Sequence, residues 1–79
     1  MKPFDIQKAR LGERVVQENG NEARYVGESD RVITRYPLIF QTFDGERWEI
    51  NFYTKGGKRG KFNRDERDLV MLSVDVKQL

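Results

Sequence analysis

The sequence predicts a small, mostly β domain (α+β by count) that occupies residues 1–79 as one unit. Two dipeptides typical of tight hairpin turns, Asn19-Gly20 and Asp44-Gly45, stand between runs in which apolar and polar residues alternate. A chain of 79 residues leaves room for a single domain. We therefore expect a short N-terminal helix and then an antiparallel meander of five to six strands. An SH3-like barrel is our first expectation, and a strongly bent sheet with the helix on one face is the second.

The first element is a short helix that begins after Asp5. The Asp5 carboxylate can accept hydrogen bonds from the free amides of the first turn, and Phe4 can pack back onto that turn. Ile6 and Ala9 fall on one face, and Gly12 suits a left-handed residue after the helix. A helix of about two turns is unstable alone, so we expect it to pack against the strands.

A first hairpin is expected around Asn19-Gly20, between residues 14–18 and 21–26. Asn-Gly favours positive φ at both central positions, as the type I′ turn requires. A two-residue loop of this kind would pair Val16 with Ala23. Residues 27–30 then form a turn.

A second hairpin has the strongest signal in the chain, with Asp44-Gly45 between residues 36–43 and 46–53. A two-residue loop would place Ile39 opposite Ile50 and Gln41 opposite Trp48. Pro37 should lie at the start of a strand or at an edge, because it has no amide hydrogen to donate.

Aromatic residues of this hairpin divide between its two faces. Trp48 and Phe52 share a face with Ile50, and we assign both to the core. Phe40 and Phe43 point to opposite sides of one strand. One of these two is therefore covered by the helix or exposed, and an exposed one would mark a protein-binding patch.

The last third of the chain begins with a glycine-rich loop over residues 55–61, after which Phe62 starts a short strand. A polar connection leads to residues 69–76, where apolar and polar residues alternate. We predict a strand there, with a helix over 66–72 as its main rival.

Absences in the composition exclude several kinds of chemistry. The chain has no His and no Cys, which removes zinc sites built from these residues, thiol nucleophiles and His-dependent triads. We therefore expect no enzyme, no cofactor and no metal. The longest apolar run, 36–40, is far shorter than the roughly 20 residues of a membrane helix, and the N-terminus has no leader pattern. We expect a cytoplasmic protein that does not bind membranes.

One segment is strongly basic. Residues 55–67 carry a local charge of +4, which leaves −2 on the rest of the chain. The candidate nucleic-acid or anion-binding residues are Lys55, Lys58, Arg59, Lys61, Arg64 and Arg67. Basic side chains neutralise phosphates, and the nearby aromatic residues Trp48, Tyr53 and Phe62 could stack on bases, with Tyr53 and Phe62 as the chosen candidates. A solvated loop that keeps a sheet edge from aggregating is the equal alternative.

Two other interpretations of this region are weaker. The segment is not a phosphate-binding P-loop, because no Ser or Thr follows Lys61 and the glycine spacing differs. The acidic residues Asp65, Glu66 and Asp68 do not match a calcium-binding loop. Local ion pairs with the neighbouring arginines explain these carboxylates better.

Several short segments along the chain carry a resemblance to a known group. They are Lys2-Pro3-Phe4-Asp5-Ile6 with Ala9 before Gly12, Asn19-Gly20 followed by Ala23-Arg24, Tyr36-Pro37, Asp44-Gly45, Tyr53-Thr54, and Asp68-Leu69-Val70-Met71. In these segments the chain resembles short β-rich proteins of unknown function that are common in phages and prophages. The resemblance implies an accessory phage-type protein and transfers no catalytic residue. In that group the segment after Tyr53-Thr54 is often acidic or neutral, whereas here it is basic.

We therefore expect a non-enzymatic phage-type accessory binding module that contacts nucleic acid through residues 55–67. The alternative is a phage-encoded protein-interaction module that modulates a host protein, or a binder of an anionic small molecule such as a nucleotide. A core of this size supplies about 3–5 kcal/mol of stability, so a homo-oligomer is also considered.

Overall fold

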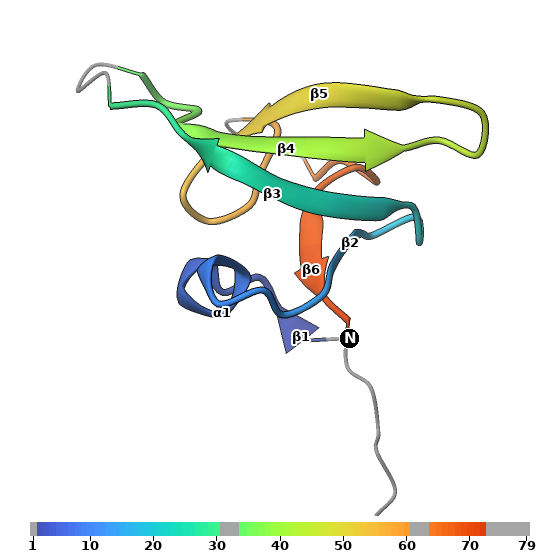
Figure 1. Cartoon of the computed structure of the whole chain (residues 1–79), viewed down its shortest axis with the longest axis horizontal. Helices are drawn as coiled ribbons and strands as arrows, with labels where there is room; N and C mark the ends of the chain where they lie inside the picture. Colours follow the sequence, from blue (N-terminus) through green and yellow to red (C-terminus); the bar gives the residue numbers. More distant parts are fainter. Residues whose placement is uncertain (1, 31–33, 61–63, 73–79) are drawn as a thin grey trace, which may run out of the picture.

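Six antiparallel strands form one sheet in a computed structural model that describes residues 2–30, 34–60 and 64–72 (Figure 1). The order of the strands across the sheet is β1-β6-β2-β3-β4-β5. The elements are β1 (Lys2–Pro3), α1 (Ile6–Arg10), β2 (Val15–Gln17), β3 (Glu22–Glu28), β4 (Leu38–Phe43), β5 (Trp48–Tyr53) and β6 (Leu69–Met71).

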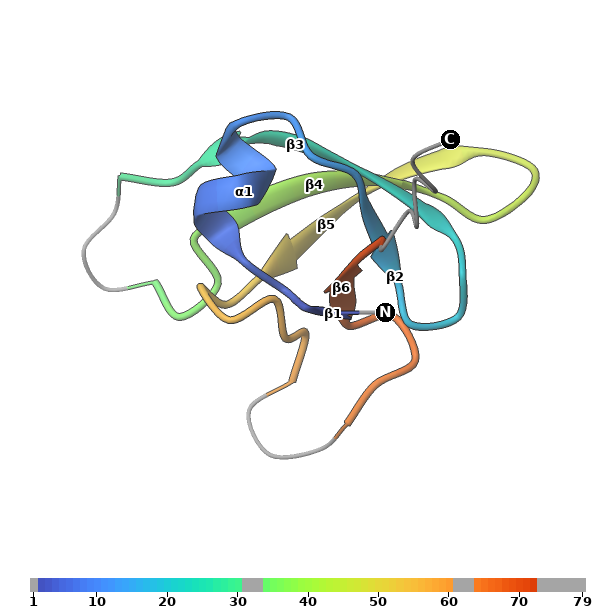
Figure 2. The same cartoon turned by 90° about the horizontal axis from the view of Figure 1, so that it is seen from below.

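The sheet is strongly curved and stays open. Strands β3, β4 and β5 form one long layer, while β2 and β6 turn away from it and α1 lies beneath the layer (Figures 1 and 2). Among the described residues no pairing joins β1 to β5, so the two remain edges and the sheet is not closed into a barrel. The closed SH3-like barrel that we expected first is therefore not formed by these strands.

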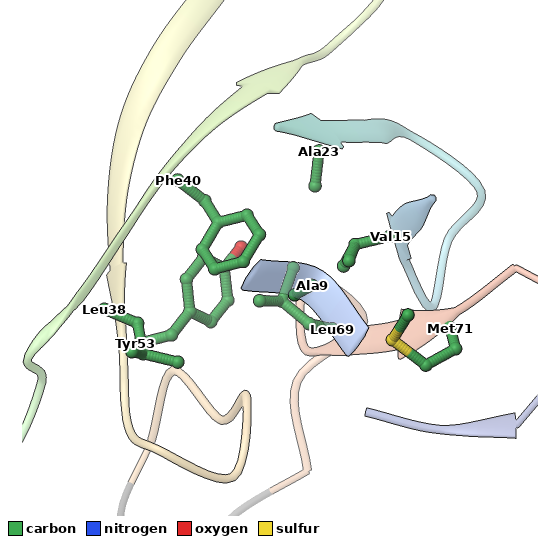
Figure 3. Close-up of a cluster of buried hydrophobic side chains, with 8 residues drawn as sticks. All are labelled: Ala9, Val15, Ala23, Leu38, Phe40, Tyr53, Leu69 and Met71. Carbon is green, nitrogen blue, oxygen red and sulfur yellow. The ribbon is translucent and has the colours of Figure 1, made fainter. Parts of the chain in front are cut away.

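The core lies on the side of the long layer that faces α1. Phe40 is at its centre and is fully buried. Its ring meets those of Phe4, Tyr25 and Tyr53 edge-on, with centroid separations of 5.9, 5.6 and 5.7 Å. The buried apolar side chains around it are Ala9, Val15, Ala23, Leu38, Leu69 and Met71 (Figure 3). Phe40 is thus the covered phenylalanine of β4.

Helix α1 is fixed at its start by Asp5. The Asp5 Oδ1 accepts hydrogen bonds from the amides of Gln7 (2.9 Å) and Lys8 (3.3 Å). Gly12 follows the helix with φ +91°, a conformation that costs glycine little. Ala9 is the buried residue of the helix and points into the core.

The first hairpin differs from the predicted one by one residue. Val15 pairs with Ala23 instead of Val16, and the Gln17 amide donates to the Asn21 carbonyl (2.8 Å). The loop thus has three residues, and only Gly20 has a positive φ. This is the turn followed by a left-handed glycine that is common in three-residue loops. A one-residue shift exchanges the two faces of a strand, so the observed register is the one that buries Val15 with Ala23.

The second hairpin differs from the predicted one by two residues. Phe43 pairs with Trp48, and Gly45 and Glu46 are the central residues of the turn. The expected Ile39–Ile50 and Gln41–Trp48 pairings are therefore wrong. The cause is Asp44, whose Oδ1 accepts from the amides of Glu46 (2.8 Å) and Arg47 (3.0 Å). A shift of two residues keeps every side chain on its predicted face.

The C-terminal strand is shorter in the described residues than the predicted strand over 69–76. Strand β6 covers Leu69–Met71 and inserts between β1 and β2. Residues 73–76 lie outside the described residues, as do Lys61 and Phe62. The rival helix over 66–72 is not formed, because β6 occupies its second half.

Candidate interaction face and basic loop

Most described cations of the basic segment are engaged by acidic side chains of the same chain. Lys58 lies 3.6 Å from Asp68, while Arg59 and Arg67 lie 4.0 and 3.4 Å from Asp65. Arg64 pairs with Glu18 of the first hairpin loop. No ion pair of Lys55 is found within the part of the chain described, and Lys61 falls outside that part. Four of the five described residues in the predicted anion-binding set therefore have an acidic partner within the chain.

A buried carboxylate organises this loop. The Asp68 side chain is fully buried and accepts hydrogen bonds from the amides of Arg59 (2.8 Å) and Asp65 (3.1 Å). Its own carbonyl accepts from the amide of Glu18 (2.8 Å). One acidic residue therefore joins both ends of the loop to the first hairpin, a structural role that the sequence analysis missed. A hydrogen bond from the Arg67 amide lowers the pKa of Asp65.

Tyr53 does not offer a stacking surface, contrary to our expectation. Its ring is fully buried, and its hydroxyl accepts from Gln17 Nε2 (3.0 Å) and donates to the Arg67 carbonyl (2.9 Å). Burial raises the pKa of Tyr53 above its ordinary value of 10.0. A base could reach this ring only if the core opened.

Trp48 and Phe52 are exposed, which corrects their assignment to the core. The exposed fractions of Trp48, Ile50 and Phe52 are 36%, 51% and 53%. On β5 the core side is taken by Tyr53, and alternation directs the three other side chains to the opposite side of the sheet. No second layer from the described residues covers that side. The sequence thus correctly predicted that Trp48, Ile50 and Phe52 share one side of β5, but it did not predict that this side is the exposed one.

We define the outer face as the side of β3, β4 and β5 that is turned away from α1 and the core. It carries six large apolar side chains: Val26, Ile39, Phe43, Trp48, Ile50 and Phe52. Contiguous exposed apolar surface of this kind is characteristic of binding sites. Val26 had not been singled out from the sequence, because nothing local to β3 says which side the core takes.

Trp48 is held on the outer face by two neighbours. The ring of Phe43 lies 5.1 Å from that of Trp48, and the Arg24 guanidinium carbon lies 4.6 Å from the Trp48 ring centroid. Arg24 also pairs with Glu22 at 3.9 Å. These contacts restrict the indole before any partner arrives, which lowers the entropy cost of binding.

Two pockets bear on the expected small-molecule alternative. One, of about 490 Å³, lies between α1 and the first hairpin and includes Arg10 and Arg14. Arg10 is already bonded to Glu28 at 2.6 and 2.9 Å. The other, of about 350 Å³, is more open and includes Tyr36 and Lys58. Neither pocket presents a buried polar group aimed at a ligand, so the outer face is the stronger candidate.

No family model, curated protein or solved structure matches this chain. Across residues 2–30, 34–60 and 64–72, no three acidic side chains come together in a way that could hold a metal ion. No helix of those same residues is long and apolar enough to cross a membrane.

Proposed function

We propose that this chain is a non-enzymatic accessory module that binds another protein through the outer face. One observation carries the proposal: Trp48, Ile50 and Phe52 stand exposed side by side on a sheet that no described layer covers. Exposed aromatic residues on a rigid strand supply large contact area at low entropic cost, and they dominate the binding energy of protein interfaces.

The charges favour a protein partner over nucleic acid. Phosphate contacts supply most of the affinity for nucleic acids, and they need available cations. Of the loop cations, Lys58, Arg59, Arg64 and Arg67 already have internal acidic partners. On the outer face Arg24 is engaged by Glu22 and Trp48. The resemblance of the sequence to short phage proteins is consistent with a host protein as the partner.

The test compares two variants in capture from a lysate of the source organism, read by quantitative mass spectrometry. The face variant is Trp48→Ser/Phe52→Ser. The control is Leu11→Ser, because Leu11 is 82% exposed and lies after α1, away from the outer face. The proposal expects a protein that the wild type and the control retain and the face variant loses at least tenfold. Purified partner must then reproduce that loss, and failure to find such a protein contradicts the proposal.

A second arm tests the nucleic-acid alternative directly. Fluorescence anisotropy with single- and double-stranded oligonucleotides is measured over a salt series on the wild type and on Lys55→Glu/Arg64→Glu. Salt-dependent binding that this variant abolishes, while Trp48→Ser/Phe52→Ser retains it, would assign the function to the basic loop instead. Absence of binding at low salt agrees with the proposal.

A further inference from the structure

The two edges of the sheet are unlike each other. Edge strand β1 has only two residues: Lys2, which is charged, and Pro3, which has no amide hydrogen. Both are features with which natural sheets prevent pairing with other strands. Edge strand β5 has six residues and contains no Lys, Pro or Gly. A long apolar edge without these features favours pairing with a further strand.

The backbone of β5 shows which groups that further strand would meet. The Asp44 amide donates to the Arg47 carbonyl (3.2 Å), which places this pair at a hydrogen-bonded position of the ladder, and hydrogen-bonded and non-hydrogen-bonded pairs alternate along the two strands from there. Residues Glu49, Asn51 and Tyr53 consequently direct their amides and carbonyls toward β4. Trp48, Ile50 and Phe52 direct theirs to the open edge, and these three also carry the exposed side chains.

Strand β5 is complementary to itself in an antiparallel register centred on Ile50. Only residues Trp48, Ile50 and Phe52 have backbone groups at the edge, so they must pair with one another. Placing Ile50 opposite Ile50 of a second copy puts Trp48 opposite Phe52 of that copy and overlaps five of the six residues, 48–52. Glu49 then faces Asn51 of the second copy. Placing Glu49 opposite its own counterpart would instead oppose like charges and is disfavoured.

We infer that two copies of this chain pair through their β5 edges in the Ile50-centred register. The sheets join into one, and the two outer faces become a single continuous apolar surface. The exposed part of Trp48, Ile50 and Phe52 in one copy is on the order of 300 Å². A stable protein interface needs about 800 Å² per partner. The second copy therefore supplies part of the surface on which the proposed function rests.

Sedimentation velocity over a range of concentrations, with far-UV circular dichroism as the check on folding, tests the pairing. Ile50→Lys places two ammonium groups against each other at the two-fold axis, and we expect at least a tenfold rise in the dimer Kd. Val26→Lys is the matched control: Val26 is 54% exposed on the same face but lies on β3, two strands from the edge. The control should leave the Kd unchanged. A chain that remains monomeric at millimolar concentration, or a dimer that both variants weaken equally, overturns the inference.

Amide hydrogen exchange measures the same pairing without a substitution that could unfold the chain. The Trp48, Ile50 and Phe52 amides should exchange at least tenfold more slowly at high than at low protein concentration. The Glu49 and Asn51 amides, bonded to β4, should be protected at both concentrations. No concentration dependence at the first three amides refutes edge pairing. A monomer that still loses its partner on Trp48→Ser/Phe52→Ser would refute the dimer and leave the proposed function standing.

Discussion

Substituting Gly57 by alanine tests how the glycine loop is fixed against the N-terminal segment. Gly57 is buried and has φ +79°, and an added Cβ would lie 2.7–2.9 Å from three side-chain atoms of Phe4. Its backbone is also bonded at both groups, to the Thr54 carbonyl and from the Leu69 amide, at 2.8 Å each. The loop therefore cannot move away from Phe4 without breaking a bond to β6.

The expected cost has two parts. A left-handed conformation with a Cβ costs about 1–2 kcal/mol, and forcing extra volume against a packed ring costs about 1–3 kcal/mol. Their sum, about 2–5 kcal/mol, is comparable to the whole stability expected of a domain of this size, about 3–5 kcal/mol. We therefore expect Gly57→Ala to be largely unfolded at 25 °C or to lose most of its denaturant midpoint.

Variants at other glycines and at Phe4 distinguish the cost of the left-handed conformation from the cost of the clash with Phe4. Their stabilities are measured by urea unfolding followed by circular dichroism. Gly20 has φ +92° but open space around it, so Gly20→Ala should cost about 1–2 kcal/mol. Gly56 has no positive φ, and its nearest atom is 3.8 Å away, so Gly56→Ala should change stability by less than about 0.5 kcal/mol. In a Phe4→Ala background the cost of Gly57→Ala should fall to that of Gly20→Ala. If Gly57→Ala costs no more than Gly20→Ala in the wild-type background, the clash between Gly57 and Phe4 does not contribute and the prediction is wrong.

Three further predictions concern charged and hydroxyl groups. Tyr53→Phe removes two hydrogen bonds and should cost about 1–3 kcal/mol at pH 7 in urea unfolding. Burial raises the pKa of Tyr53 above its ordinary value of 10.0, so this tyrosine ionises at lower pH in the unfolded chain than in the folded one. The stability of the wild type should therefore fall as the pH rises above 10.0, and the stability of Tyr53→Phe should fall less. The hydrogen bond from Arg10 lowers the pKa of Glu28 in the folded chain below its ordinary value of 4.5. The stability that ionised Glu28 contributes is therefore present above pH 4.5 and is lost as the pH falls through the pKa of Glu28 in the folded chain. Unfolding midpoints between pH 7 and 3 should accordingly depend less on pH in Glu28→Gln, and equal slopes would contradict this. In urea unfolding at pH 7, Asp68→Asn should lower the stability by about 1–3 kcal/mol. Glu66→Gln, at an exposed site, should change the stability by less than about 0.5 kcal/mol in the same urea experiment.

Local patterns predicted the hairpins but not their registers. Asn19-Gly20 and Asp44-Gly45 both mark turns, yet each turn is placed by a side-chain hydrogen bond that the dipeptide does not reveal. Asn19 Oδ1 accepts from the Asn21 amide (2.9 Å), and Asp44 Oδ1 accepts from the amides of Glu46 and Arg47. Such bonds compete with a two-residue loop centred on the dipeptide for the same backbone groups.

The side of the sheet that forms the core could not be predicted from alternation alone. Trp48, Ile50 and Phe52 are more apolar than their neighbours, so a rule that buries the more apolar side places them inside. The core is set instead by Phe40, whose ring meets both Tyr53 of β5 and Phe4 of the N-terminal segment. That contact joins residues far apart in the sequence, so no window around β5 contains it.

The position of β6 has a consequence for how the chain assembles. Strands β3, β4 and β5 pair with sequence neighbours, so this meander closes only short loops. Strand β1 pairs only with β6 among the described strands, and β6 is the last of them to leave the ribosome. The N-terminal segment must therefore wait for the C-terminal part of the chain, while the outer face is already present on the meander. During synthesis the outer face is thus available to a partner before the domain is complete.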